Sequence, residues 1–205
     1  MLFFLGNQKK NTYFAEILYM KKLIIFASGN GSNAERIITY FKENKLAEVS
    51  LILTNNPQAG VISRAKRLGV PCRIFDKKDL YESNYLLELL KREQPDLIIL
   101  AGFLWKFPTN LIENFPHKIV NIHPSLLPKY GGKGMYGMHV HHEVIKHGEK
   151  ESGITIHYVN EHYDQGAIIY QERVAITPED TPKSLAEKVH TLEYQAFPLI
   201  IKQLL

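Results

Sequence analysis

The chain has 205 residues, of which 45% are hydrophobic, and this fits one domain with an ample core. Its 25 Lys plus Arg residues are scattered and exceed its 21 Asp plus Glu residues only slightly, for a formal charge of +4, so a nucleic-acid partner is not expected. A single cysteine, Cys72, excludes a disulfide framework and a multi-cysteine metal cluster, and it fits a reduced, cytoplasmic setting. No apolar run reaches the ~18 residues of a membrane span, so we expect no membrane partner.

The first nineteen residues differ in character from the rest of the chain. They begin with a short apolar stretch, but no basic segment precedes it and no small-residue cleavage pattern comes after it, so they are not typical of a signal peptide. At Met20 the sequence changes to MKKLIIFASGNGSN, which is typical of the start of a domain. We therefore interpret residues 1–19 as an N-terminal extension or a mis-called start, and residues 20–205 as one domain.

Apolar strand-like runs then alternate with amphipathic helical ones. The runs are continuous rather than alternating, which predicts strands buried on both faces, and the segments between them have apolar residues at helical spacing. The predicted strands cover residues 23–27, 49–54, 70–75 and 96–102, and the predicted helices between them cover residues 33–45, 60–69 and 79–94. This β-α-β-α order predicts a doubly wound, mostly parallel, Rossmann-like sheet of the α/β class.

The second half of the chain changes this pattern. A fifth strand over residues 118–123 is followed by a glycine-rich loop and a short helix around residues 141–148. Residues 153–159 and 167–174 then form two more strands, whose short connector predicts an antiparallel pair. A closing helix is expected over residues 184–205.

The first predicted strand ends in the turn SGNGSN, which leads into a helix. In doubly wound sheets, ligands bind beyond the carboxyl ends of the strands, where the strand order reverses. Glycines allow close approach of the backbone and a helix N-terminus offers free N–H groups, so Gly29, Gly31, Ser32 and Asn33 predict a phosphate cradle. A plain turn without ligand is the alternative. A dinucleotide site is disfavoured, because the second strand ends in TNNPQAG, without the acidic residue that would hold a ribose.

Two polar side chains close the predicted fifth strand. Residues two apart on a strand project from the same face, so Asn121 and His123 point toward one spot, and Pro124 and Pro128 end the strand directly after them. Such a pair either satisfies nearby backbone groups or forms a reactive site. The fourth strand ends in AGFLWKFP, whose aromatic side chains either wall a flat ligand or pack into the core.

A carboxylate that completes this pair must come from elsewhere in the chain. Asp164, in the connector between the last two strands, is either an ordinary turn aspartate or that partner. Beside His123 it would favour the imidazolium and raise the pKa of the histidine above ~6.5. A positive imidazole beside an amide would stabilise an oxyanion.

Histidines also gather in MHVHHEVIKHG, which raises a metal hypothesis. In HEVIKH, however, His142 and His147 are five residues apart and would lie on different sides of a helix, unlike the zinc pattern H-E-x-x-H. We therefore expect no metal.

Taken together, these motifs carry a resemblance to a known family. SGNGSN, PDLIILAGF, NIHPSLLPKY, GITIHYV and DQGAIIYQ occur in the order found in the phosphoribosylglycinamide formyltransferases, folate-dependent enzymes of purine synthesis, from about Met20 to the C-terminus. The resemblance implies transfer of the formyl group of 10-formyltetrahydrofolate, a co-substrate, to the amine of N1-(5-phospho-D-ribosyl)glycinamide in IMP biosynthesis. It also implies small-molecule partners and a cytoplasmic monomer or weak homodimer.

The resemblance assigns roles to particular residues. It implies a catalytic trio of Asn121, His123 and Asp164. The positions implied for the ribonucleotide are Gly31, Ser32, Asn33 and Glu193. Those implied for the folate are Leu104, Trp105, Lys106 and Phe107, with Asn121, Asn160 and Asp164. Thr155 and His157 match polar positions on the strand that faces the site.

The chain departs from the family pattern in its loop GKGMYG, which is longer than the common form, in Trp105, where an arginine is expected, and in His190, where a glutamine is expected. A formyltetrahydrofolate hydrolase and other amine formyltransferases of the same fold are the alternatives. The hydrolases usually carry an N-terminal regulatory domain, and the methionyl-tRNA formyltransferases normally add a C-terminal nucleic-acid-binding domain. We expect neither in this chain of 205 residues.

Overall fold

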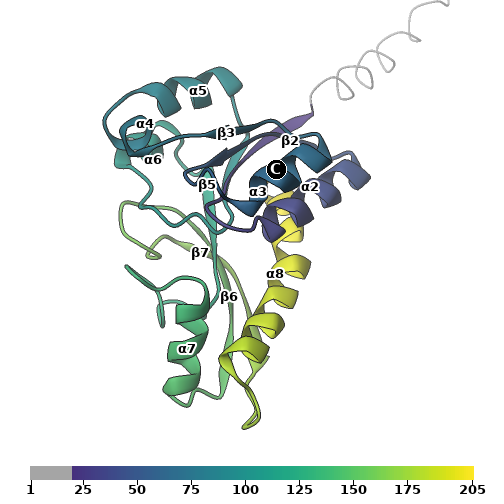
Figure 1. Ribbon diagram of the computed structural model, residues 1–205, viewed down its shortest axis with the longest axis vertical. Coiled ribbons are helices and arrows are strands. Elements are labelled where there is room, and N and C mark those ends of the chain that lie inside the picture. The colour runs from purple at the N-terminus through teal and green to yellow at the C-terminus, as the bar shows by residue number, and fades with distance from the viewer. Residues whose placement is uncertain (1–19) are drawn as a thin grey trace, which may run out of the picture.

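The computed structural model describes residues 20–205, so the predicted extension or mis-called start, residues 1–19, lies outside the described residues. In this part of the chain seven strands form one sheet (Figure 1). The strands are β1 (Lys21–Phe26), β2 (Ala47–Thr54), β3 (Cys72–Ile74), β4 (Leu97–Leu100), β5 (Ile119–His123), β6 (Glu151–Tyr158) and β7 (Ile168–Ala175). The helices are α2 (Ser32–Asn44), α3 (Gly60–Leu68), α4 (Lys77–Tyr81), α5 (Tyr85–Glu93), α6 (Thr109–Asn114), α7 (Met138–Lys146) and α8 (Pro182–Leu204).

The sheet has the order β3-β2-β1-β4-β5-β6-β7. The pairs from β3 to β5 are parallel, whereas β6 is antiparallel to both β5 and β7. The prediction of a mostly parallel α/β sheet with an antiparallel pair near the C-terminus is therefore confirmed. The strand order reverses between β1 and β4, so the carboxyl ends of these two strands open the crevice in which such sheets bind ligands.

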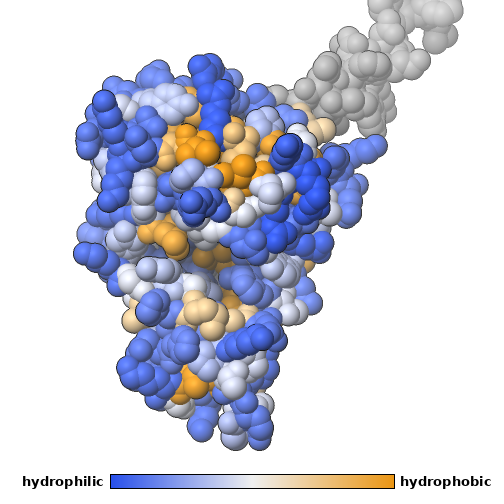
Figure 2. All heavy atoms as spheres, in the orientation of Figure 1, coloured by the Kyte–Doolittle hydropathy of each residue, from blue (hydrophilic) through white to orange (hydrophobic). Residues whose placement is uncertain are grey.

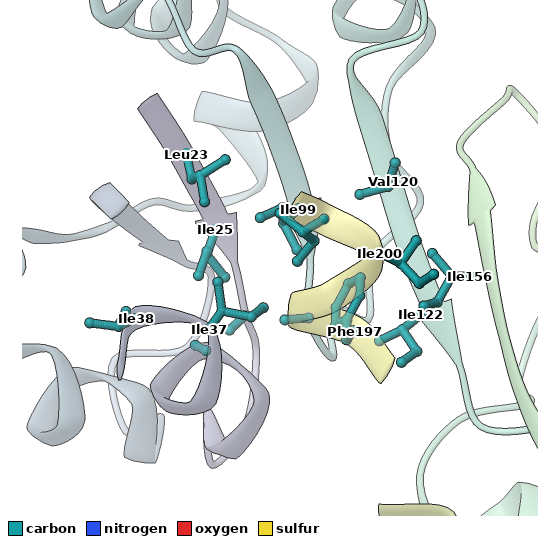
Figure 3. Packing of buried hydrophobic residues seen from close by; sticks show 14 of the residues in the cluster. Leu23, Ile25, Ile37, Ile38, Ile99, Val120, Ile122, Ile156, Phe197 and Ile200 are labelled. Atoms are coloured by element: carbon teal, nitrogen blue, oxygen red, sulfur yellow. The ribbon is translucent and has the colours of Figure 1, made fainter. Parts of the chain in front are cut away.

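Successive residues of the parallel strands point into two separate cores. Ile25 and Ile99 face a core that α2, α3, α7 and α8 cover, and Phe26 and Leu100 face a core that α4, α5 and α6 cover. Burial on both faces explains why these strands read as continuous apolar runs. Figure 3 shows Phe197 of α8 among the isoleucines of the first core, where its ring is fully buried.

The C-terminal helix α8 contacts elements from both halves of the chain. It begins after Thr181, whose side chain forms a capping box with Ser184, and it continues through Pro198. It contacts α2 at one end and α7 at the other, and it packs on β6 and β7 (Figure 1). Because of this course, α8 can place a side chain beside the turn that follows β1.

Two predictions for the first half of the chain are wrong in detail. The helix expected over residues 79–94 is divided into α4 and α5, because the hydroxyl of Ser83 takes part in backbone hydrogen bonding, accepting from Tyr85 N–H and donating to the Asp79 carbonyl. The third strand, β3, has only three residues and is partly exposed rather than buried on both faces, because it lies at the edge of the sheet. The helix α6 was not predicted.

Hydrophilic side chains cover most of the face shown in Figure 2, and apolar ones form small groups along its middle. None of the helices described within residues 20–205 combines the length and the apolar character that crossing a bilayer requires.

Candidate active site

A cavity of about 700 Å³ lies at the crevice between β1 and β4. Its walls come from the turn after β1, the loop after β4, the end of β5, the loop before α7 and the inner side of α8. A smaller cavity of about 50 Å³ adjoins it, and the two share Phe103, Asn121, Tyr163 and Asp164 in their walls. The site is therefore one larger and one smaller compartment that meet at these four residues.

The turn after β1 brings the predicted phosphate cradle to the wall of the larger cavity, where Gly31, Ser32 and Asn33 lie. Gly31 has a φ of 78°, and a Cβ atom there would lie 2.5 Å from the side chain of Val61, so the turn requires glycine at this position. No side chain caps α2. The free N–H groups and the positive dipole end of this helix can therefore bind an anion.

Arg64 of α3 stabilises this turn through hydrogen bonds to Asn30. Its Nε donates to the carbonyl oxygen of Asn30 at 2.8 Å and its Nη2 to the side-chain oxygen of the same residue at 3.2 Å. The guanidinium also pairs with Glu35 of α2. No pattern in the sequence indicated this contact, because Arg64 lies on a separate helix and matches no local motif.

Glu193 connects α8 to the cradle. Its side chain is buried, with 5% of the residue exposed, and its Oε2 accepts hydrogen bonds from Asn33 Nδ2 at 2.9 Å and from His190 Nδ1 at 2.7 Å. The hydrogen bond that His190 donates to Glu193 raises the pKa of His190 above its ordinary value. Two residues that are 160 positions apart in the chain, both expected to contact the ribonucleotide, are thus brought together.

The expected trio also comes together, at the junction of the two cavities. Asn121 Nδ2 lies 3.4 Å from Asp164 Oδ1, and His123 Nδ1 lies 3.5 Å from Asp164 Oδ2. Asp164 comes from the connector between β6 and β7 with a φ of 55°, and Gly132 N–H donates to its Oδ2 at 2.8 Å. The ring of His123 donates from Nε2 to the carbonyl oxygen of Tyr130 at 2.7 Å, which fixes its orientation.

The electrostatics of the trio correct one expectation. Burial lowers the pKa of His123, and this effect is larger than the opposing influence of Asp164 and of the Tyr130 carbonyl, so the prediction of a raised pKa is wrong for this state. Only 4% of His123 is exposed, and removing water disfavours the imidazolium. Burial also acts to raise the pKa of Asp164, but His157, the charge of His123 and the Gly132 N–H together lower it.

Across the antiparallel pair, His157 of β6 lies opposite Asn121. Its Nδ1 donates to the carbonyl oxygen of Tyr158 at 2.8 Å, so in the neutral ring Nε2 accepts from Asn121 Nδ2 at 3.1 Å. Thr155 has a different role from the one expected, because it lines neither cavity. Its hydroxyl donates to the Ser125 carbonyl and accepts from the backbone of the loop after β5, which it supports.

The segment expected to cup the folate is divided between the two cavities. Leu104 lines the larger one, and Trp105, Lys106, Phe107 and Asn160 line the smaller one. The Trp105 ring packs edge-on against Phe75, with 6.2 Å between centroids, and stacks on Tyr81, with 6.4 Å between centroids. It therefore takes part in an aromatic cluster.

Several lining residues were not expected from the sequence. The glycine-rich loop before α7 contributes residues 132–137, α7 contributes Met138, and Tyr163 lies in the wall of both cavities. His141 of α7 is 5% exposed and its Nδ1 has no hydrogen-bond partner among the described residues. Burial lowers the pKa of His141 to about 4. Among residues 20–205, no cluster of three or more His, Cys, Asp or Glu side chains is arranged to hold a metal ion.

Comparison with known proteins identifies the family. Residues 21–201 match the family model described as "Formyl transferase". The chain is 38% identical over 187 residues to a chloroplastic phosphoribosylglycinamide formyltransferase of Arabidopsis thaliana. The matched region covers 88% of this chain but only 64% of that relative. It is 40% identical over 192 residues to the phosphoribosylglycinamide formyltransferase of Bacillus subtilis, covering 91% of this chain and 95% of that one.

Solved structures agree with this. Glycinamide ribonucleotide transformylase 1 of Geobacillus kaustophilus is similar with a TM-score of 0.83 and 38% identity, over 91% of this chain and 100% of that one. The phosphoribosylglycinamide formyltransferase of Bacillus Halodurans is similar with a TM-score of 0.80 and 38% identity, over 90% of this chain and 95% of that one. The chain belongs to the formyl transferase family.

Proposed function

We propose that this protein is a phosphoribosylglycinamide formyltransferase of purine biosynthesis. It transfers the formyl group of 10-formyltetrahydrofolate to the amine of N1-(5-phospho-D-ribosyl)glycinamide, giving the N2-formyl product and tetrahydrofolate. The observation that carries the proposal is the position of Asn121, His123 and Asp164 where a cavity with an anion cradle meets a second, aromatic-walled cavity. The names of the similar bacterial and plant proteins support it.

The ribonucleotide fits the larger cavity. Its phosphate would bind to the free N–H groups at the start of α2, beside Gly31, Ser32 and Asn33, because a helix N-terminus favours negative charge. The buried carboxylate of Glu193, which already accepts from Asn33, would accept from a ribose hydroxyl. Bound in this way, the glycinamide amine would extend toward Asn121 and His123, which line the same cavity.

We place the folate across the junction of the cavities. The smaller cavity alone, at about 50 Å³, is too small for a pterin, so the ring would extend along its rim into the larger cavity. Leu104, Trp105 and Phe107 supply apolar surface, and Asn160 together with Lys106 supplies polar groups. An aromatic-walled slot with a few polar groups suits a pterin. The formyl carbon would then lie at the junction of the cavities, within reach of the amine.

The chemistry follows from the trio. As the neutral amine attacks the formyl carbon, the carbonyl oxygen becomes negative, and N–H donors aimed at it stabilise the tetrahedral intermediate. Loss of one such donor typically costs ~2.7 to 4 kcal/mol. Asn121 would donate through Nδ2, whose contact with Asp164 Oδ1 is long at 3.4 Å. His123 Nε2 is already bonded to the Tyr130 carbonyl, so His123 would donate through Nδ1 once that nitrogen is protonated. The low pKa of Asp164 keeps a carboxylate 3.5 Å from His123 Nδ1, which stabilises the imidazolium as it forms.

Proton transfer and positioning complete the mechanism. The attacking amine must lose a proton and the departing folate nitrogen must gain one, and Asp164 with His123 provides a relay between them. Holding the two substrates in line lowers the activation free energy by up to ~7 to 11 kcal/mol relative to the bimolecular reaction. The residues of this chain therefore need to orient both substrates and move one proton.

The setting belongs to the same proposal. The reaction partners are small molecules, and the domain comprises residues 20–205, most of which the family model matches. We place the protein in the cytoplasm as a monomer or weak homodimer, a setting in which the single free Cys72 remains reduced.

The experiment compares transfer with hydrolysis. Purified protein is mixed with 10-formyltetrahydrofolate, and tetrahydrofolate release is followed with and without the ribonucleotide. We expect release to depend on the ribonucleotide and to match formation of the formylated product mole for mole. Equal release without the ribonucleotide would contradict the proposal in favour of a hydrolase.

A further inference from the structure

Lys133 differs from the other ionisable residues in the wall of the larger cavity. The wall contains two carboxylates, Asp164 and Glu193, and several histidines, but no other lysine or arginine among the described residues. The Lys133 side chain is exposed, and among residues 20–205 no carboxylate pairs with it. Within this part of the chain, the cavity therefore holds one permanent positive charge that the fold itself does not neutralise.

A tight turn fixes the backbone on which Lys133 stands. Met135 N–H donates to the Gly132 carbonyl at 3.1 Å, which closes a four-residue turn. Gly134, its third residue, has a φ of 89°, and the third position of a type II turn requires a positive φ. The turn is attached to the trio, because Gly132 N–H donates to Asp164 Oδ2 at 2.8 Å. The lysine thus extends from a fixed point next to the catalytic carboxylate.

A phosphate monoester needs more charge than the cradle provides. It carries about −1.5 to −2 at neutral pH, whereas a helix N-terminus offers the equivalent of only about half a positive charge. Asn33 of the cradle contacts a carboxylate, Glu193. Arg64, the cation that contacts the turn at Asn30, does not line the cavity and is already paired with Glu35. A flexible ammonium group that can reach the anion as a point charge supplies what is missing.

We propose that Lys133 binds the phosphate of the ribonucleotide and determines the preference for the phosphorylated substrate over the corresponding nucleoside. This inference rests on the proposed function and deepens it. The loop GKGMYG is where this chain departs from the common family pattern, and the lysine lies within it. The departure then supplies positive charge for the phosphate group.

Two other lysines provide matched comparisons. Lys129 lies on the same loop, pairs with Glu149 at 2.9 Å and lines neither of the two cavities. Lys106 lines the smaller cavity, on the folate side. Each has the same side chain and charge as Lys133 but a different place relative to the phosphate cradle.

The test measures kcat/KM of Lys133→Met with the ribonucleotide and with the dephosphorylated nucleoside. Because this lysine is exposed, water screens its contact with the phosphate, and we expect the ratio of nucleotide to nucleoside kcat/KM to fall about tenfold, equivalent to ~1.4 kcal/mol. The fall should appear as a higher KM for the ribonucleotide. Lys133→Arg, which keeps the charge, should restore most of the ratio, and this excludes a general loss of loop structure.

The controls separate the possible sources of an effect. Lys129→Met should keep the parent ratio, and Lys106→Met should change the KM for the folate rather than the ratio. An unchanged ratio in Lys133→Met, or a higher KM for 10-formyltetrahydrofolate alone, would overturn the inference. Failure of the proposed function would look different, because the parent protein itself would then not formylate the ribonucleotide.

Discussion

The two sides of the active site are built in different ways. On the side of β1, the anion cradle consists of backbone groups, whose shape depends on Gly31 and on the contact of Arg64 with Asn30. On the side of β5 and β6, the polar groups are side chains. Asn121 lies opposite His157 across an antiparallel pair, and Asp164, from the connector after β6, lies 3.5 Å from His123. In the proposed function, the first side binds substrate and the second performs the reaction.

The two sides also satisfy their polar groups differently. His123 and His157 are buried, and each ring donates to a backbone carbonyl, so their orientations are fixed before any substrate binds. In the cradle, the N–H groups at the start of α2 have no side-chain cap and Asn33 Oδ1 is buried without a partner among the described residues. The cradle therefore has hydrogen-bonding capacity left for a ligand. Substitutions in the cradle should therefore raise KM for the ribonucleotide, whereas substitutions in the trio should lower kcat.

The largest effect is expected for His123→Ala. Loss of the donor to the oxyanion should lower kcat about 10²- to 10³-fold, with little change in the KM for the ribonucleotide. Steady-state kinetics measures both, and the thermal unfolding midpoint reports whether the fold is intact. A raised KM with an unchanged kcat would remove the distinction between the two sides.

His141, which lies between the two sides, should make stability depend on pH. Its pKa is about 4 in the folded protein because burial disfavours the charged ring, against ~6.5 in the unfolded chain, so the unfolded state binds more protons between these values. Stability is then fully present above pH ~6.5 and is lost as the pH falls toward ~4, by at most about 3 kcal/mol.

The measurement is the free energy of unfolding in urea at several pH values. His141→Gln should flatten the dependence between pH ~6.5 and ~4, whereas His139→Gln, at an exposed position on the same helix, should leave it as in the parent. The pKa of His141 also depends on the charges of nearby groups, so parent and variants are compared at one ionic strength. These groups are Glu193, His190, His123 and His142. Parallel curves for parent and His141→Gln would contradict the assignment.

Gly31→Ala tests the backbone of the cradle. The added methyl group would lie 2.5 Å from the side chain of Val61, at a φ of 78°, and a left-handed conformation costs an L residue ~1 to 2 kcal/mol. We expect the KM for the ribonucleotide to rise about tenfold, with a smaller change in kcat. Gly29→Ala, where the methyl group meets no atom within 4 Å, should raise KM less. Equal effects of the two substitutions would show that cradle shape is not what binds the phosphate.

The smallest kinetic effect is expected for Arg64→Met. Without the hydrogen bonds to Asn30, typically ~0.5 to 1.5 kcal/mol each, the cradle should be less well ordered and the KM for the ribonucleotide a few-fold higher. Arg67→Met is the matched control, because Arg67 pairs with the same Glu35 at 2.6 Å and the structure shows no contact of its side chain with Asn30. If both substitutions raise KM equally, the effect comes from the ion pairs of Glu35 and not from the cradle.

Some site residues could be predicted from the sequence, whereas the partners that orient them could not. Strand periodicity placed Asn121 and His123 on one face, and the glycines of SGNGSN indicated the cradle, because both depend on local geometry. The partners that orient these groups, such as Arg64 and the carbonyl of Tyr130, depend on contacts between distant elements and had no local signal. For Asp164 the sequence left two alternatives, an ordinary turn aspartate and the partner of Asn121 and His123, and only the family resemblance assigned it to the trio.

The expectation for the pKa of His123 was wrong for a related reason. A charged neighbour can be inferred from a motif, but burial depends on everything that packs around the ring, and here burial has the larger effect. The break of the helix at Ser83 and the exposed edge strand β3 are similar cases, because each depends on position in the folded sheet or on a side-chain hydrogen bond.

The most direct test of the division between the two sides is the affinity of His123→Ala for the ribonucleotide, measured by titration calorimetry without folate. If the cradle binds and the trio reacts, the Kd should stay within about threefold of the parent value while kcat falls about 10²- to 10³-fold. A Kd that rises in proportion to the loss of kcat would contradict this division of roles.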